Sequence, residues 1–167
     1  AASGRALERA ASIPCRGFYF DLVEFDRRAG EYSTANTPAV SLIYALQVQL
    51  ERIENEGLEA RFARHERMAR RTGEWTEELA ESTGQAFEVL ALEGFRSPTV
   101  TAILLPAGIS GSAIVEHLAD EGITIATGYG RLKGSAIRIG HMGDHTEAGL
   151  EVVLETATTA IEVATND

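Results

Sequence analysis

The sequence is almost free of lysine and cysteine. Lys133 is the only lysine among its 15 basic residues, so any Schiff-base chemistry carried out by this chain alone would have to use it. Cys15 is the only cysteine, which excludes an internal disulfide. No apolar run approaches the ~20 residues that a membrane-spanning helix needs, and no signal-peptide pattern opens the chain. These features predict a soluble, cytoplasmic protein without a membrane partner.

Positive charge is also scarce. The formal net charge is −10, which would repel phosphate backbones, so the sequence argues against nucleic acid as a partner. The one dense basic stretch, residues 61–71, also contains Glu66, and we interpret it as the solvated face of a helix. With 167 residues, 44% of them apolar, the chain can bury one core. It begins with Ala1 instead of methionine, from which we expect a processed or truncated product.

The hydrophobic periodicity changes along the chain from about 3.6 to about 2 residues and then alternates between the two. Thr37 is expected to cap a helix whose first residue is Pro38. From there on the pattern predicts an α+β fold, a small, mostly antiparallel sheet with helices packed on one side. The expected helices cover residues 1–17, 18–28, 38–56, 58–80, 110–122 and 144–163, and the expected strands cover 87–92, 99–105, 123–127 and 135–140.

Arg138 is the strongest candidate for a binding residue. In the strand 136–140 the alternation places Ile137 and Ile139 on one face, and it places Arg138 on the other face between small residues. A planar guanidinium can bind a carboxylate through two parallel hydrogen bonds, and the small neighbours leave space for a ligand. The strand pattern is equally compatible with an arginine in a surface ion pair.

Thr34 and Thr37 form a second candidate site. They lie in the hydroxyl-rich stretch 32–38 directly before a predicted helix, where hydroxyls and a helix start could together bind an anion. The alternative is that these residues only cap the helix.

Two further patterns do not predict sites. The glycine-rich loop 128–134 follows a strand but leads into another strand, whereas phosphate-binding loops open a helix; we expect a tight turn or a close backbone approach. His141 and His145 are four residues apart, but Gly143 between them interrupts the helix that would align them, so no metal site is predicted.

Three stretches of the sequence together resemble the class V pyridoxal-phosphate (PLP)-dependent aminotransferases, in particular the alanine-glyoxylate and serine-pyruvate branch. Their order and spacing are similar to those of the family from the first residue to about Leu154. The stretches are Arg16-Gly-Phe-Tyr-Phe-Asp21, Asn36-Thr-Pro-Ala-Val-Ser41 followed by Glu56-Gly-Leu-Glu59 and Arg64-His65, and residues 124–143 with the ending Ile137-Arg-Ile-Gly-His-Met-Gly143.

The resemblance implies a homodimeric enzyme of PLP fold type I. Residues 1–36 would be a linking arm from a large domain absent from this chain, and residues 37–167 would be the small C-terminal domain with the long helices that lead into it. Arg138 would bind the substrate α-carboxylate, while Thr34 and Thr37 would contact the phosphate of the partner subunit's PLP.

The resemblance also implies what the chain does not contain. The family's Schiff-base lysine lies upstream, before the position of Ala1, and Lys133 does not match it, so no catalytic residue is expected in this chain. The whole enzyme would move an amino group from alanine or serine to glyoxylate or pyruvate, and the isolated chain is not expected to be active. Two alternatives stay open: a free-standing α+β module that binds small carboxylates, and a PLP-dependent desulfurase or lyase, for which Cys15 is poorly placed.

Overall fold

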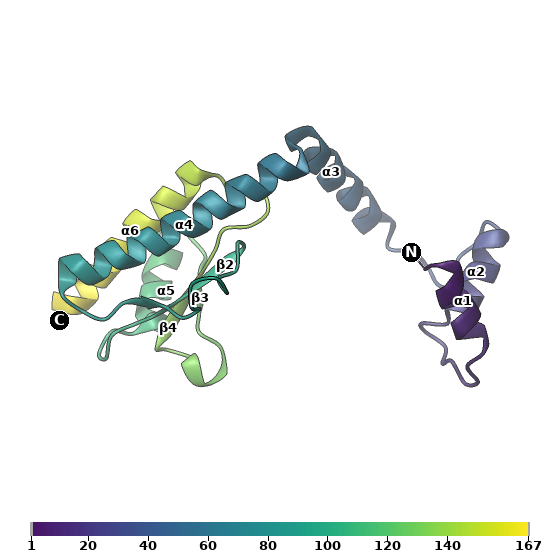
Figure 1. The fold of residues 1–167 in the computed structure, drawn as a ribbon, viewed down its shortest axis with the longest axis horizontal. Helices are drawn as coiled ribbons and strands as arrows, with labels where there is room; N and C mark the ends of the chain where they lie inside the picture. Colours follow the sequence, from purple (N-terminus) through teal and green to yellow (C-terminus); the bar gives the residue numbers. More distant parts are fainter. Residues whose placement is uncertain (1, 167) are drawn as a thin grey trace. The chain divides into compact units, whose positions relative to one another are not determined.

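The computed structural model describes residues 2–166 and divides into two compact units, Ala1–Arg52 and Ile53–Asp167. Figure 1 shows their elements. The division falls inside helix α3 (Val40–Glu56), whereas the sequence places a domain boundary after residue 36; that domain assignment stays a prediction. Within residues 2–166, no helix combines the length and apolar character that crossing a membrane requires.

The first unit holds α1 (Gly4–Ala11), α2 (Leu22–Gly30) and most of α3. The Ser3 hydroxyl accepts a hydrogen bond from the Ala6 amide and begins α1, and the Asp21 carboxylate accepts from the first amides of α2. The expected start of the second helix at Phe18 is therefore wrong, because Asp21 caps it three residues later. None of residues 2–52 is buried.

The start of α3 also differs from the prediction. The helix begins at Val40, and the Ala39 carbonyl accepts the hydrogen bond from the Ile43 amide. The Val40 amide donates to the Pro38 carbonyl at 2.9 Å, which forms a short turn ahead of the helix. Pro38 is therefore not the first helical residue, and Thr37 is not the cap.

The second unit confirms the predicted α+β class. Its four strands pair entirely antiparallel in the order β1-β2-β4-β3, and α4, α5 and α6 pack on one face of the sheet (Figure 1). The elements in chain order are α4 (Leu58–Thr83), β1 (Glu88–Val89), β2 (Val100–Leu104), α5 (Gly111–Asp120), β3 (Ala126–Thr127), the 3-10 helix η1 (Gly130–Leu132), β4 (Ala136–Gly140) and α6 (Glu147–Asn166).

The register of the two central strands separates an apolar face from an open one. Ile103 pairs with Ile137 on the face covered by helices, and Ala102 pairs with Arg138 on the other face. The isoleucines join the core, which contains apolar side chains from α4, α5 and α6. Among them are Met68, Trp75 and Leu79 of α4, Ile114 and Leu118 of α5, and Leu150, Leu154 and Ile161 of α6.

The first turns of α4 differ from the sequence prediction. The apolar residues Leu58 and Phe62 are 56% and 54% exposed. Arg61 and His65 are buried in their place, on the same helical face as Met68. The interpretation of the basic run as a solvated face is therefore wrong for these two residues, because they contact a loop from the far end of the chain.

Candidate functional site

Arg138 lies on the open face of the sheet, in the middle of β4. Its register partners on the two neighbouring strands are Ala102 and Ala126, so no large side chain stands beside it at that level. Its Nε donates a hydrogen bond of 2.8 Å to the Thr127 carbonyl, and the side chain is exposed. Within residues 2–166 its two terminal nitrogens have no hydrogen bond or ion pair. The fork that could grip a carboxylate is therefore available.

The end of β4 is anchored by His141, whose side chain is fully buried. Its Nδ1 is 3.1 Å from the Pro98 carbonyl and its Nε2 is 2.9 Å from the Thr101 hydroxyl. Since a carbonyl can only accept, Nδ1 carries the proton and Nε2 accepts from Thr101 in the neutral ring. Burial lowers the pKa of His141, which favours this neutral form. Nowhere in residues 2–166 do three or more His, Cys, Asp or Glu side chains gather as metal ligands would.

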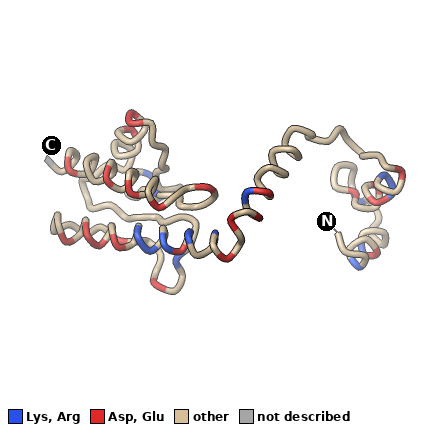
Figure 2. Tube along the Cα trace, turned by 90° about the horizontal axis from the view of Figure 1, so that it is seen from above, with Lys and Arg blue, Asp and Glu red and all other residues tan. Residues whose placement is uncertain are grey.

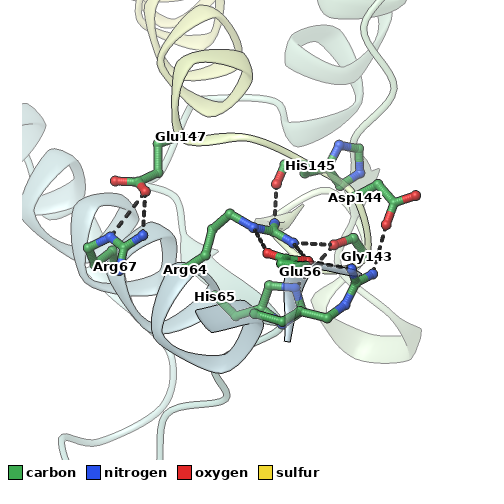
Figure 3. A network of polar contacts seen from close by, with 9 residues as sticks. Glu56, Arg64, His65, Arg67, Gly143, Asp144, His145 and Glu147 are labelled. Atoms are coloured by element: carbon green, nitrogen blue, oxygen red, sulfur yellow. Dashed lines mark hydrogen bonds and ion pairs between the residues drawn. The ribbon is translucent and has the colours of Figure 1, made fainter. Parts of the chain in front are cut away.

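The loop after His141 is held by three side chains of α4 (Figure 3). Arg64 donates through Nη2 to the Gly143 carbonyl at 3.0 Å and through Nη1 to the His145 carbonyl. His65 Nε2 lies 3.2 Å from the Gly143 carbonyl, and Arg61 Nη2 donates to the Asp144 carboxylate at 2.8 Å. Arg61, Arg64 and His65 share one helical face because they are spaced by three and four residues.

Glu56, the last residue of α3, holds both arginines in place. It accepts 2.7 Å hydrogen bonds from Arg61 Nη1 and from Arg64 Nε, and a third of 2.9 Å from Arg64 Nη2. The hydrogen bonds from Arg64, followed by those from Arg61, lower the pKa of Glu56 to about 2. We call Glu56, Arg61, Arg64 and His65 the loop clamp. Figure 2 shows that the basic residues of α4 gather in its first part, where the loop clamp lies, and that acidic residues follow.

Thr34 and Thr37 come together at a surface cavity of the first unit. The cavity measures about 370 Å³, and its other lining residues are Phe25, Ala29, Ser33, Ala35, Asn36 and Pro38. Both threonines are exposed, and their hydroxyls form no hydrogen bond within the described part of the chain. The hydroxyl and amide groups at one side of this largely apolar cavity can donate hydrogen bonds to a phosphate group. No lysine or arginine lines the cavity, so the positive charge that balances a bound phosphate would have to come from outside it.

The glycine loop 128–134 makes the close approach that the sequence predicts. Gly128 lies against Leu132, where an added Cβ would be 2.2 Å from the carbonyl oxygen. Gly130 and Gly134 have φ values of 59° and 87°, which favour glycine. Lys133 follows η1 and is exposed. The loop thus shapes the backbone beside Arg138 and carries no phosphate-binding helix start.

The structure brings the two predicted threonines together and places Arg138 in the other unit. Sequence reasoning missed the loop clamp and the anchoring of His141. The helical spacing of Arg61 and His65 with Met68 and Trp75 was a usable signal, since it puts both polar residues on the core face of α4. The loop they contact lies about 80 positions away along the chain, and no local pattern contains that information.

Comparison with known proteins gives consistent matches, although no protein-family model matches the chain. An uncharacterized aminotransferase of Methanocaldococcus jannaschii is 40% identical over 129 residues, covering 76% of this chain and 32% of the relative. The serine–glyoxylate aminotransferase of Arabidopsis thaliana is 31% identical over 164 residues, covering 92% and 39%.

The crystal structure of an alanine–glyoxylate aminotransferase from Nostoc sp. superimposes with a TM-score of 0.81 and 25% identity. The match covers 95% of this chain and 42% of that structure. The chain therefore spans about a third to two fifths of the length of the relatives that it matches.

Proposed function

We propose that this chain is part of an alanine/serine–glyoxylate aminotransferase, of whose length it spans about a third to two fifths, and that it supplies the substrate-carboxylate site of a PLP-dependent transaminase. The reaction would move an amino group from alanine or serine to glyoxylate or pyruvate. The observation that carries the proposal is the exposed Arg138 guanidinium, which has two unpartnered nitrogens within the described residues and lies between Ala102 and Ala126 on the open face of the sheet.

Arg138 would bind the α-carboxylate of both substrates. Bidentate hydrogen bonding fixes the direction of the carboxylate as well as its position. The remaining Nε donor is already used by the Thr127 carbonyl, so the guanidinium plane has a preset orientation. A substrate oriented in this way has less rotational and translational freedom left to lose in the transition state. This saving is a large part of the rate increase that a positioning contact provides.

The hydroxyls of Thr34 and Thr37 would hold the phosphate of PLP, in the site of a partner subunit. Their free donors and the shared cavity support this role. Because no lysine or arginine lines the cavity, the charge of the phosphate would have to be balanced by groups outside it. PLP supplies an electron sink for the bonds around the substrate α-carbon. Lys133 is exposed in the turn after η1, so we propose that the Schiff-base lysine comes from outside these 167 residues and that the chain alone does not transaminate.

The exposed apolar surface of the first unit supports the proposal that this unit packs against other protein, namely a large domain and a second subunit. Phe18 and Phe20 are 84% and 78% exposed, and no residue between 2 and 52 is buried. Such a surface is typical of segments that pack against other protein. The large aliphatic and aromatic side chains exposed on α3 are Val40, Leu42, Ile43, Tyr44, Leu46, Val48 and Leu50. A cytoplasmic location, favoured by the single cysteine, completes the proposal.

The test is Arg138→Ala in the complete transaminase that carries this chain. We expect KM for both the amino acid and the keto acid to rise by roughly 10- to 100-fold, because a charge-assisted hydrogen-bonded pair contributes about 1.5–3 kcal/mol. Arg131→Ala is the matched control: Arg131 lies in the neighbouring η1 and is exposed. Unchanged KM values for both substrates in Arg138→Ala would overturn the assignment.

A further inference from the structure

We propose that Arg64 is a positioning residue for the carboxylate site, and that it acts by holding Met142 beside the Arg138 face. This inference rests on the function proposed above. Arg64 itself belongs to α4 and reaches the site only through the loop that joins β4 to α6.

The loop lies directly beside the candidate site. Gly140, the last residue of β4, is on the same face of the strand as Arg138. A Cβ added at Gly140 would lie 3.8 Å from the Met142 methyl carbon, so the Met142 side chain extends back over this face. Met142 is 45% exposed and flexible by nature, and its own side chain has no polar group to fix it. Its place therefore depends on the backbone on either side.

That backbone is held firmly on both sides of Met142. On the strand side, the His141 amide donates to the Thr99 carbonyl at 3.0 Å and the His141 ring is fully buried. On the helix side, Arg64 bonds the carbonyls of Gly143 and His145 at once. Gly143 has a φ of 70°, a conformation that the loop keeps at low cost only with glycine. Arg64 thus fixes the side of Met142 that the sheet does not reach, together with His65 at the Gly143 carbonyl and Arg61 at Asp144, and it is the residue that binds two of the loop carbonyls at once.

A guanidinium is needed for this arrangement. The Arg64 group binds Glu56 through Nε and Nη2 while Nη1 and Nη2 bind the loop, which uses its planar fork in two directions. A lysine keeps the charge but has one nitrogen, which cannot span both the carboxylate and two carbonyls. Arg64→Lys should therefore loosen the loop without removing the positive charge.

Arg67 provides a matched control on the same helix. It is nearly half exposed and donates to the carboxylate of Glu147 at 2.8 Å, so it contacts the start of α6 and not the loop carbonyls. Arg67→Lys changes the same chemical group one turn away. Both variants would be compared with the unchanged protein for thermal unfolding, so that a loss of folded protein is not read as a kinetic effect.

The experiment measures KM and kcat for the amino acid and the keto acid in the complete transaminase. We expect Arg64→Lys to raise both KM values about tenfold or more, since small misplacement of a positioning contact is costly, and to change kcat less. Arg67→Lys should leave both KM values within about twofold. The KM increase should also largely disappear when Arg64→Lys is made in a Met142→Ala background, because the two residues would then act through one contact.

Additive effects of Arg64→Lys and Met142→Ala, or equal effects of Arg64→Lys and Arg67→Lys, would overturn this inference while leaving Arg138 as the carboxylate site. An unchanged KM in Arg138→Ala would instead overturn the proposed function. Met142→Ala is an exposed substitution and is expected to fold, so the inference can be tested even if Arg64→Lys is unstable.

Discussion

Residues 2–52 and residues 53–166 are both rich in amphipathic helices, yet only the second unit buries them. In α6 the apolar side chains of Leu150, Leu154 and Ile161 are 0–4% exposed, whereas Ile43 and Leu46 of α3 are 57% and 56% exposed. A similar helical pattern thus gives a core in one unit and an open apolar surface in the other. The periodicity predicts that a helix has an apolar side, but it does not identify the surface that covers it.

The charged clusters of the two units differ in the same way. In α2, Glu24 bonds Arg27 and Arg28, which are three and four residues away in one helix. In the second unit, Glu56 and Arg64 join a helix to a loop whose residues lie about 80 positions later. Both clusters lower the pKa of their glutamate to about 2 through arginine hydrogen bonds, but only the second fixes tertiary structure.

The largest difference between the units is expected for a matched pair of leucines. Leu154→Ala should lower the free energy of unfolding by about 2–5 kcal/mol, because it empties a fully packed position. Leu46→Ala in the isolated chain should change it by less than about 0.5 kcal/mol, since Leu46 is already in water. Urea unfolding followed by the fluorescence of Trp75, the only tryptophan, measures both. Similar losses in the two variants would show that α3 is covered in the chain by itself.

A second pair compares two glycines. Gly128→Ala would place a Cβ 2.2 Å from the Leu132 carbonyl oxygen, so we expect a loss of about 1–3 kcal/mol in the unit that contains Trp75. Gly30→Ala, at the end of α2, meets no atom within 4 Å and should leave the Trp75 transition unchanged. The same urea titration tests the pair. A Gly128→Ala protein with unaltered stability would mean that the loop beside Arg138 can shift freely.

The sheet shows which features of the strands can be predicted from the local sequence pattern. Alternation predicts β4 as residues 135–140 and the structure has Ala136–Gly140, with Arg138 on the open face as expected. The other strands expected at 87–92 and 123–127 contain only Glu88–Val89 and Ala126–Thr127, because only these residues pair with the longer central strands β2 and β4. Strand existence was therefore predictable, and the length of edge strands was not.

The candidate site also has one part that local pattern predicts and one part that it does not. The face that carries Arg138 follows from period-2 alternation within five residues, and it was predictable. The helical spacing places Arg61 on the core face of α4, but it does not identify the partners of Arg61 and Arg64, because the carbonyls and the carboxylate that they bind belong to residues 143–145. Burial of a charge depends on partners that are distant in sequence, so the loop clamp required the structure.

The smallest expected effect is the difference between Glu56 and Glu24 in how each contributes to stability as pH falls. The folded-state pKa of Glu56 lies near 2, below its ordinary value of 4.5, because Arg64 and Arg61 donate hydrogen bonds to the carboxylate. A depressed pKa contributes stability that is fully present above about pH 4.5 and is lost as pH falls toward 2. Glu56→Gln should therefore lower the stability of the Trp75-containing unit at about pH 6, and the difference from the unchanged protein should shrink between about pH 4.5 and pH 2.

Glu24→Gln is the control for this titration, because Glu24 has an equally low pKa from Arg27 and Arg28 but belongs to the first unit. Arg67 also lowers the pKa of Glu147, and that contribution cancels when each variant is subtracted from the unchanged protein. Urea unfolding by Trp75 fluorescence at a series of pH values gives the differences. If Glu24→Gln shows the same pH-dependent loss as Glu56→Gln, the second cluster does not hold tertiary structure more than the first, and the contrast between local and long-range ion pairs fails.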